Sequence, residues 1–123
     1  MYQFWYNFDV SPATLGCRFF RSAVGAEPVR DWLRSLDADA CKQIGHDILR
    51  VQWRWPVSRP IVGALGEGIY EVRSTAGKRE FRVLFYISES AMVLLHGFQK
   101  QTQSTPKAQL TIAKGRKRED RDE

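Results

Sequence analysis

The stretch GEGIYEVRSTAGKREFRVLFYISESAMVLLHGFQK, residues 66–100, decides the fold because its apolar residues recur at every second position. Two short polar connections, Thr75–Gly77 and Ser88–Ser90, interrupt this period and are typical of hairpin turns. The predicted strands are residues 69–74, 80–87 and 92–100. Three consecutive strands on tight turns predict an antiparallel meander.

Side-chain alternation along these strands assigns residues to the two faces of the sheet. Positions 81, 83, 85 and 87 are all apolar and predict the core face, so Arg82 points the opposite way, towards solvent or a ligand. In the last strand, alternation groups His96 and Lys100 with positions 92, 94 and 98, unless Gly97 forms a bulge that resets it. The pattern predicts an open, concave sheet face bearing Arg73, Arg82, His96 and Lys100.

Ahead of residue 64 the apolar residues follow the helical period instead. Residues 27–36 predict one helix, with Pro28 at its first position, and residues 36–55 predict a second, capped by Asp37 or Asp39. Because only a few residues separate them, the two helices should form an αα-hairpin that covers one face of the sheet.

The second helix contains one weak point and has a clear end. Gly45 lowers its helical propensity and is a candidate for a close helix crossing. Pro56 and Pro60 end the helix and hold an extended loop over residues 56–63. Before the two helices, residues 17–23 predict a short strand.

Residues 105–120 predict a last helix, with Thr105 as its cap and Pro106 at its first helical position. The charged tail after Gly115 is expected to fray. Ala108, Leu110 and Ile112 are the apolar residues available for packing this helix on the sheet.

The predicted element order is β–α–α–β–β–β–α, an α+β domain with a small, curved antiparallel sheet, an N-terminal αα-hairpin and a C-terminal helix. We expect one domain over residues 17–118, followed by a charged tail at 119–123. Residues 1–16 stand apart as an aromatic arm. This arm is either an additional strand or the product of a start codon placed too far upstream.

Composition argues against several classes of protein. No apolar run approaches the roughly 18 residues of a membrane span, and the N-terminus lacks the pattern of a signal peptide. Cys17 and Cys41 are isolated, so free thiols in a cytoplasmic protein are expected and a zinc site is not. The chain has no HExxH, P-loop or GxGxxG motif and no plausible Ser/His/Asp order, and we expect neither a metal nor a cofactor.

Positive charge is concentrated in the second half of the chain. Residues 73–118 hold ten Lys and Arg against Glu80 and Glu89, whereas residues 1–72 are neutral overall. Such an asymmetry favours a polyanion as partner, although many small basic proteins have no such partner. Charge alone indicates affinity for phosphate and says nothing of what is done to it.

Each residue of the predicted basic face also has a structural interpretation. Arg73 can pair with Glu71 or Glu80 across the hairpin, whereas Arg82 in a central strand needs a partner or a ligand. His96 alone is as well explained as a hydrogen-bonded edge residue. A solvated surface is the alternative for Lys100, Lys107, Lys114 and residues 116–118, and a structural role is expected for His46.

Several motifs in unbroken order resemble the HigB-like, phage-associated branch of the RelE/ParE toxin superfamily. They are EPVRDWLRSLD (27–37), IGHDILRVQWRWP (44–56), ALGEGIYEVRS (64–74), REFRVLFYI (79–87) and MVLLHGFQKQTQSTPKAQLTIAKGRK (92–117). The resemblance covers residues 17 to about 118. It implies a bacterial or phage toxin of a type II toxin–antitoxin module, with a RelE-like fold of a small antiparallel sheet flanked by helices.

The resemblance also implies an endoribonuclease that cuts mRNA without a metal, usually on the ribosome, because the RNA 2′-hydroxyl is the nucleophile. Arg73 and Arg82 would brace the phosphate, and His96 would transfer protons near neutral pH. Lys100 stands near the family's basic group at the end of the last strand, where neighbouring cations favour its neutral amine as a base. The implied RNA or ribosome contacts are Lys78, Arg79, Tyr86, Phe98, Thr105, Lys107 and Lys114, with Tyr86 or Phe98 stacking on a base.

One departure from the family pattern leaves the general acid and base open: no tyrosine follows Tyr86. Two other functions share the fold, namely a ParE-like inhibitor of DNA gyrase and an inactive remnant kept for antitoxin or DNA binding. All three imply a cognate antitoxin, expected to be a helix-turn-helix protein that also holds the complex on operator DNA. The converging basic residues favour the nuclease.

Overall fold

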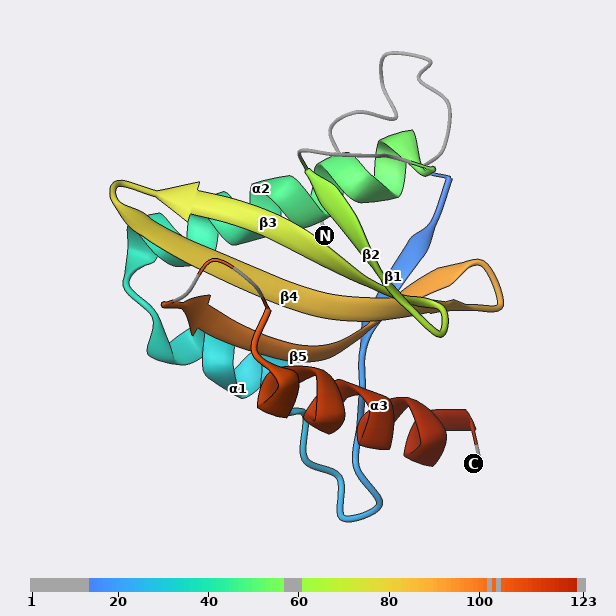
Figure 1. The fold of residues 1–123 in the computed structure, drawn as a ribbon. Coiled ribbons are helices and arrows are strands. Elements are labelled where there is room, and N and C mark those ends of the chain that lie inside the picture. Colours follow the sequence, from blue (N-terminus) through green and yellow to red (C-terminus); the bar gives the residue numbers. More distant parts are fainter. Residues whose placement is uncertain (1–13, 57–60, 102, 104, 122–123) are drawn as a thin grey trace.

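The computed structural model describes residues 14–56, 61–101, 103 and 105–121. Its elements are β1 (Gly16–Phe19), α1 (Pro28–Ser35), α2 (Ala38–Arg54), β2 (Val62–Gly66), β3 (Ile69–Ala76), β4 (Arg79–Ser88), β5 (Ala91–Lys100) and α3 (Lys107–Arg121). One sheet, in the order β1-β5-β4-β3-β2, has α1 and α2 packed on one face and α3 on the other (Figure 1). The α+β class is confirmed, while most of the predicted N-terminal arm lies outside the described residues.

The predicted meander is confirmed. Strands β3, β4 and β5 pair antiparallel in sequence order, and their turns are shorter than the sequence suggested. Gly77, with φ of 65°, opens the β3–β4 turn. The β4–β5 turn is Glu89–Ser90, and both residues have positive φ, as a two-residue hairpin turn with the twist of the strands requires.

Two features of the sheet differ from the prediction. Residues 62–66, of which 62 and 63 were predicted to be loop, form β2, which pairs antiparallel with β3. Glycines at positions 63 and 66 weaken the strand signal there, because glycine is depleted in strands. In addition, β1 pairs parallel with β5, so the sheet is mixed and not purely antiparallel.

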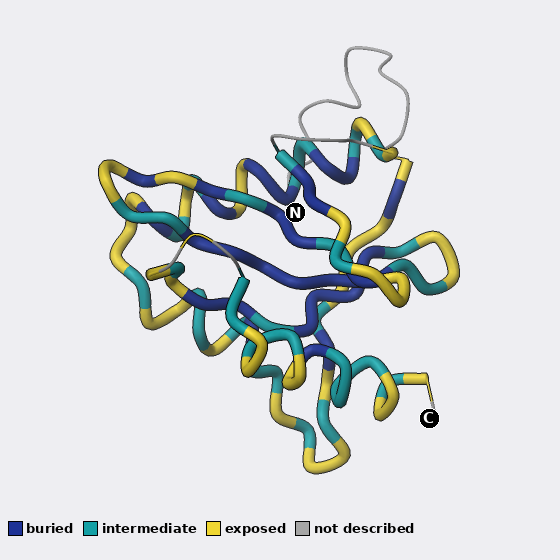
Figure 2. Tube along the Cα trace, in the orientation of Figure 1, coloured by how far each residue is buried: buried dark blue, intermediate teal, exposed yellow. Residues whose placement is uncertain are grey.

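The larger core lies between the sheet and the helical hairpin. Asp37 caps α2 by accepting a hydrogen bond from the Ala40 backbone N–H at 3.3 Å, as one of the two predicted caps. From the helices, Val29, Ala40, Ile44, Ile48 and Val51 pack against Val72, Phe81, Val83, Phe85, Met92 and Leu94 of the sheet. Figure 2 shows the central strands buried along most of their length and the turns exposed.

The second core lies under α3. Leu84, Tyr86, Val93, Leu95 and Phe98 pack there with Ala113. The expected fraying after Gly115 is wrong as far as Arg121, because the helix end is held by polar contacts. Asp120 accepts two hydrogen bonds from Arg18 at 2.9 Å each and one from the Tyr86 hydroxyl. The sheet face predicted to be open is therefore covered by α3 over much of its length.

A bulge in β5 changes the face on which His96 lies. The pairing with β4 skips Leu95 between Leu94 and His96, so the bulge is at Leu95 and not at Gly97. Leu94 packs in the larger core, whereas Leu95 and His96 both face α3. The prediction that His96 shares a face with positions 92 and 94 is wrong for this reason.

The close approach between elements expected at Gly45 is found at Gly97 instead. A Cβ atom at Gly45 would meet no heavy atom within 4 Å, so the predicted close helix crossing is absent there. A Cβ atom at Gly97 would instead lie 2.3 Å from the ring of Trp32. Gly97 is thus the residue that lets α1 approach the sheet. No helix within the described ranges has the length and apolarity to cross a membrane.

Candidate functional site

A cleft of about 340 Å³ lies where the β2, β3 and β4 strands meet the segment leading into α3. Its lining residues are Ala64, Leu65, Glu71, Arg73, Arg82, Lys100, Gln103, Thr105 and Leu110. Four of these, Arg73, Arg82, Lys100 and Thr105, were predicted from the sequence as site residues. The cleft is the open end of the sheet face that α3 otherwise covers.

Strand register brings the two arginines together. Arg73 on β3 is directly opposite Arg82 on β4, and Glu80 is opposite Lys100 on the neighbouring pair of strands. The two-residue turn after β3 fixes this register, because a shift by one residue would turn either side chain to the other face. Two like charges directly across a strand pair repel one another, so this arrangement needs a compensating anion.

Glu71 supplies that anion, and sequence reasoning had treated it only as a partner of Arg73. The residue is 3% exposed. Its Oε2 atom accepts a hydrogen bond from Arg73 Nε at 3.1 Å, and Arg73 Nη2 lies 3.1 Å from the same oxygen. Its Oε1 atom accepts a hydrogen bond from the Thr105 hydroxyl at 2.6 Å. The spacing Glu-x-Arg on one strand face is the sequence signal for this contact.

Arg82 is buried with an unused donor. Its side chain is 10% exposed, and its Nη1 atom donates to Glu80 Oε1 at 3.2 Å and to the Phe81 carbonyl oxygen at 2.9 Å. Its Nε atom has no hydrogen-bond partner and lies 3.9 Å from Glu71 Oε1. A buried donor without an acceptor costs about 1–3 kcal/mol.

Two further contacts shape the cleft wall. A Cβ atom at Gly63 on β2 would lie 2.6 Å from Arg73 Nη2, so the guanidinium approaches β2 at a position where the strand has no side chain. Thr105 does not cap α3 as predicted, since its hydroxyl is taken by the buried Glu71 carboxylate and the helix begins at Lys107. Lys100 donates to the backbone carbonyl oxygen of Gln103 beside the cleft.

His96 does not line the cleft. Arg116 Nη1 lies 3.2 Å from His96 Nδ1, and because arginine can only donate, Nδ1 is an acceptor and Nε2–H donates to Gln109 Oε1. Burial, with the Arg116 charge as a smaller cause, lowers the pKa of His96 below 6.5, although the Gln109 contact opposes this. The ring thus joins β5 to α3 in its neutral form.

The predicted RNA-contacting residues are divided between free surface and internal contacts. Tyr86 and Phe98 are buried, and Phe98 stacks on His96 with ring centroids 5.7 Å apart, so neither presents a face for a base. Lys78 and Lys107 are exposed. Arg79 pairs with Asp37, and Lys114 Nζ lies 2.6 Å from Glu67 Oε2.

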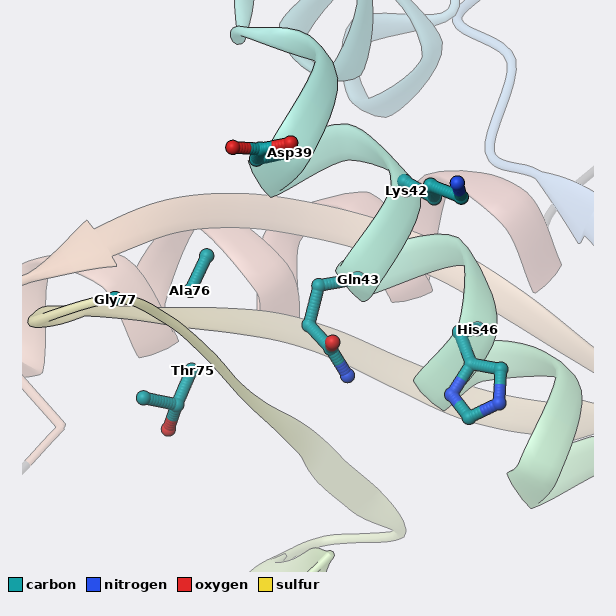
Figure 3. A pocket seen from close by; sticks show the side chains of 7 residues that line it. All are labelled: Asp39, Lys42, Gln43, His46, Thr75, Ala76 and Gly77. Carbon is teal, nitrogen blue, oxygen red and sulfur yellow. The ribbon is translucent and has the colours of Figure 1, made fainter.

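A larger pocket of about 500 Å³ lies between α2 and the β3–β4 turn (Figure 3). It is lined by Asp39, Lys42, Gln43, His46, Thr75, Ala76 and Gly77. In Figure 3 the Asp39 and Lys42 side chains point away from one another, so no charged groups converge. Charged side chains converge in the smaller cleft and not in this pocket, so the smaller cleft is the better candidate for a functional site. Among the described residues, no group of three or more His, Cys, Asp or Glu side chains is arranged to hold a metal ion.

A comparison with protein families identifies the family of this chain. The family profile described as Phage derived protein Gp49-like (DUF891) matches residues 31–118, which include the cleft and all described helices and strands except β1, the start of α1 and the end of α3. A search of curated proteins found no match. The chain therefore belongs to the Gp49-like family of phage-derived proteins, a RelE/ParE-like family associated with the toxins of toxin–antitoxin systems.

Proposed function

We propose that this protein is the HigB-like toxin of a type II module and that it cleaves mRNA, on the translating ribosome, in the cleft around Arg73 and Arg82. The observation that carries the proposal is the convergence of Arg73, Arg82 and Lys100 on one cleft, where Arg82 Nε has no acceptor. A phosphodiester offers two acceptor oxygens that match guanidinium donors.

Cleavage of RNA requires few catalytic groups from the protein. RNA carries its own nucleophile, so binding must align the 2′-hydroxyl with phosphorus and stabilise the charge that grows on the phosphate oxygens. Arg82, fixed by Glu80 and the Phe81 carbonyl, is the pre-organised donor, and the more exposed Arg73 completes the phosphate contact. Lys100 adds positive charge at the leaving-group side, and the exposed Lys107, two residues after the cleft-lining Thr105, is an RNA or ribosome contact in this proposal.

His96 has a positioning role in this proposal. Proton transfer by His96 would first require α3 to release the ring from Gln109 and Arg116. We infer that the antitoxin, a helix-turn-helix protein in this proposal, covers the basic cleft and that the complex reaches operator DNA through the antitoxin. The toxin is proposed to act in the cytoplasm.

The test is the mapping of RNA 5′ ends in cells that briefly express the protein. The wild type should create new ends within translated codons, and an Arg73→Ala/Arg82→Ala variant should not. The matched control is Lys42→Ala/Arg54→Ala, which removes two exposed positive charges from α2 and should leave cleavage intact. Growth arrest with intact mRNA in wild type and both variants would instead indicate an inhibitor of DNA gyrase.

A further inference from the structure

We propose that Glu71 is the general base of the reaction, which takes the proton from the attacking 2′-hydroxyl; this role rests on the proposed ribonuclease function. Among the described residues that line the cleft, Glu71 is the one carboxylate. Its burial beside two arginines and a threonine hydroxyl makes it more than a surface counter-charge.

The hydrogen bonds of the carboxylate leave one position open. Oε2 faces Arg73 through two nitrogen atoms, and Oε1 accepts from Thr105. A carboxylate oxygen has two lone pairs, so Oε1 keeps one for a further donor. This oxygen lies 3.9 Å from Arg82 Nε, the buried donor without an acceptor.

An acceptor with a spare lone pair and a donor without a partner thus lie side by side on two side chains that line the cleft, and a bound strand would reach Arg82 Nε once the side chains that enclose it move. A ribose 2′-hydroxyl donates its proton to a carboxylate, and a phosphate oxygen on the adjoining group accepts from a guanidinium N–H. The dinucleotide that undergoes cleavage contains both groups on neighbouring atoms. An RNA strand would therefore satisfy Glu71 Oε1 and Arg82 Nε together, whereas DNA, which lacks the 2′-hydroxyl, would satisfy only Arg82.

The proposed step balances without any further reactant. The 2′-oxygen forms a bond to phosphorus while its proton passes to Glu71, and the bond from phosphorus to the 5′-oxygen breaks. The departing 5′-oxygen takes a proton from the Lys100 ammonium or from water, which leaves a 2′,3′-cyclic phosphate and a 5′-hydroxyl. A positioned general base accelerates a reaction of this kind by about 10²–10⁴-fold.

Other groups are less well placed for this proton. His96 lies under α3 with both ring nitrogens in contact with Gln109 or Arg116. Glu80 does not line the cleft. Among the described residues that line the cleft, only Glu71 carries a carboxylate.

The experiment measures single-turnover cleavage of a defined mRNA on programmed ribosomes by purified wild type, Glu71→Gln and Glu71→Ala. Binding is measured separately with the same mRNA carrying one 2′-deoxy residue at the cleavage site, which cannot react. Glu89→Gln is the matched control, because it removes one exposed carboxylate in the β4–β5 turn, outside the cleft. Arg82 keeps the Glu80 and Phe81 contacts in Glu71→Gln, which favours a folded variant.

We expect Glu71→Gln to cleave at least about 100-fold more slowly than wild type while it binds the 2′-deoxy mRNA as well or more tightly. Added formate should restore part of the rate to Glu71→Ala, since the removed side chain leaves space for a small carboxylate. Equal loss of binding and cleavage, or no response to formate in a folded Glu71→Ala, would assign Glu71 to the positioning of Arg73 and overturn the proposal. Full activity of Glu71→Gln would also overturn it. If the mRNA stayed intact with wild type, the proposed ribonuclease function itself would be wrong.

Discussion

Replacing Gly97 with alanine should destabilise the protein, because β5 and α1 meet at this glycine. The added Cβ atom would lie 2.3 Å from both Cε3 and Cζ3 of Trp32 and 2.9 Å from its Cδ2. Trp32 cannot withdraw freely, since its ring packs edge-to-face on Phe81 with centroids 6.2 Å apart. Overpacking of this kind costs about 1–3 kcal/mol of unfolding free energy. For a domain of this size the melting temperature should fall by roughly 3–18 °C.

Gly45→Ala is the matched control, with the same change in a different environment. A Cβ atom at Gly45 meets nothing within 4 Å, and the residue lies inside α2. Alanine is the better helix former by about 1 kcal/mol, so this variant should unfold at a higher temperature than wild type. Both variants are compared with wild type by urea denaturation and by thermal melts followed by far-ultraviolet circular dichroism.

The two substitutions should therefore change stability in opposite directions. A Gly97→Ala protein as stable as wild type would show that the Trp32 ring has room to move, and the proposed tight contact between α1 and β5 would be wrong. A Gly45→Ala protein less stable than wild type would show that the outer surface of α2 is constrained by something other than helix propensity.

Three charge-dependent predictions follow from the pKa shifts. The Arg18 contact lowers the pKa of Asp120, so Asp120→Asn should lower the unfolding free energy at pH 7 by about 1–2 kcal/mol, and urea denaturation should show the difference shrinking below about pH 4. The Asp37 carboxyl, whose pKa Arg79 lowers to about 2, should titrate near that value by carbon-13 NMR and move towards 3.8 in Arg79→Ala. Burial lowers the pKa of His96, so its ring should titrate below 6.5 by NMR; the stability it contributes is complete above pH 6.5 and is lost as pH falls through the folded pKa.

The fold could be predicted where one simple period dominates the sequence. Alternation over residues 69–100 identified the meander, and the helical stripe with Pro28 identified the helical hairpin. Strand β2 was missed because two of its five residues are glycine, which removes the alternation signal. The parallel pairing of β1 with β5 was missed because local sequence says nothing of the partner of a strand 75 residues away along the chain, Gly16 with Ala91.

The part of the site that could be predicted is the part that strand register determines. Arg73 and Arg82 are opposite one another because a short hairpin forces them to be, and that is readable from spacing. The role of Glu71 required knowledge of Thr105, which lies 34 residues further along the chain and reaches the carboxylate only through the docking of α3. His96 was misplaced because the bulge at Leu95 has no sequence signal of the kind that a glycine gives.

Helix α3 connects the stability of the fold to the geometry of the cleft. Leu110 packs at the edge of the second core and also lines the cleft, and Thr105 just before the helix holds Glu71. The far end of the same helix is anchored by Asp120 to Arg18 and Tyr86. Loosening that distant anchor should shift the helix and disturb the Thr105–Glu71 contact, because a helix moves as a rigid element. A loss of cleavage in Asp120→Asn would therefore arise from the cleft wall, although Asp120 itself does not line the cleft.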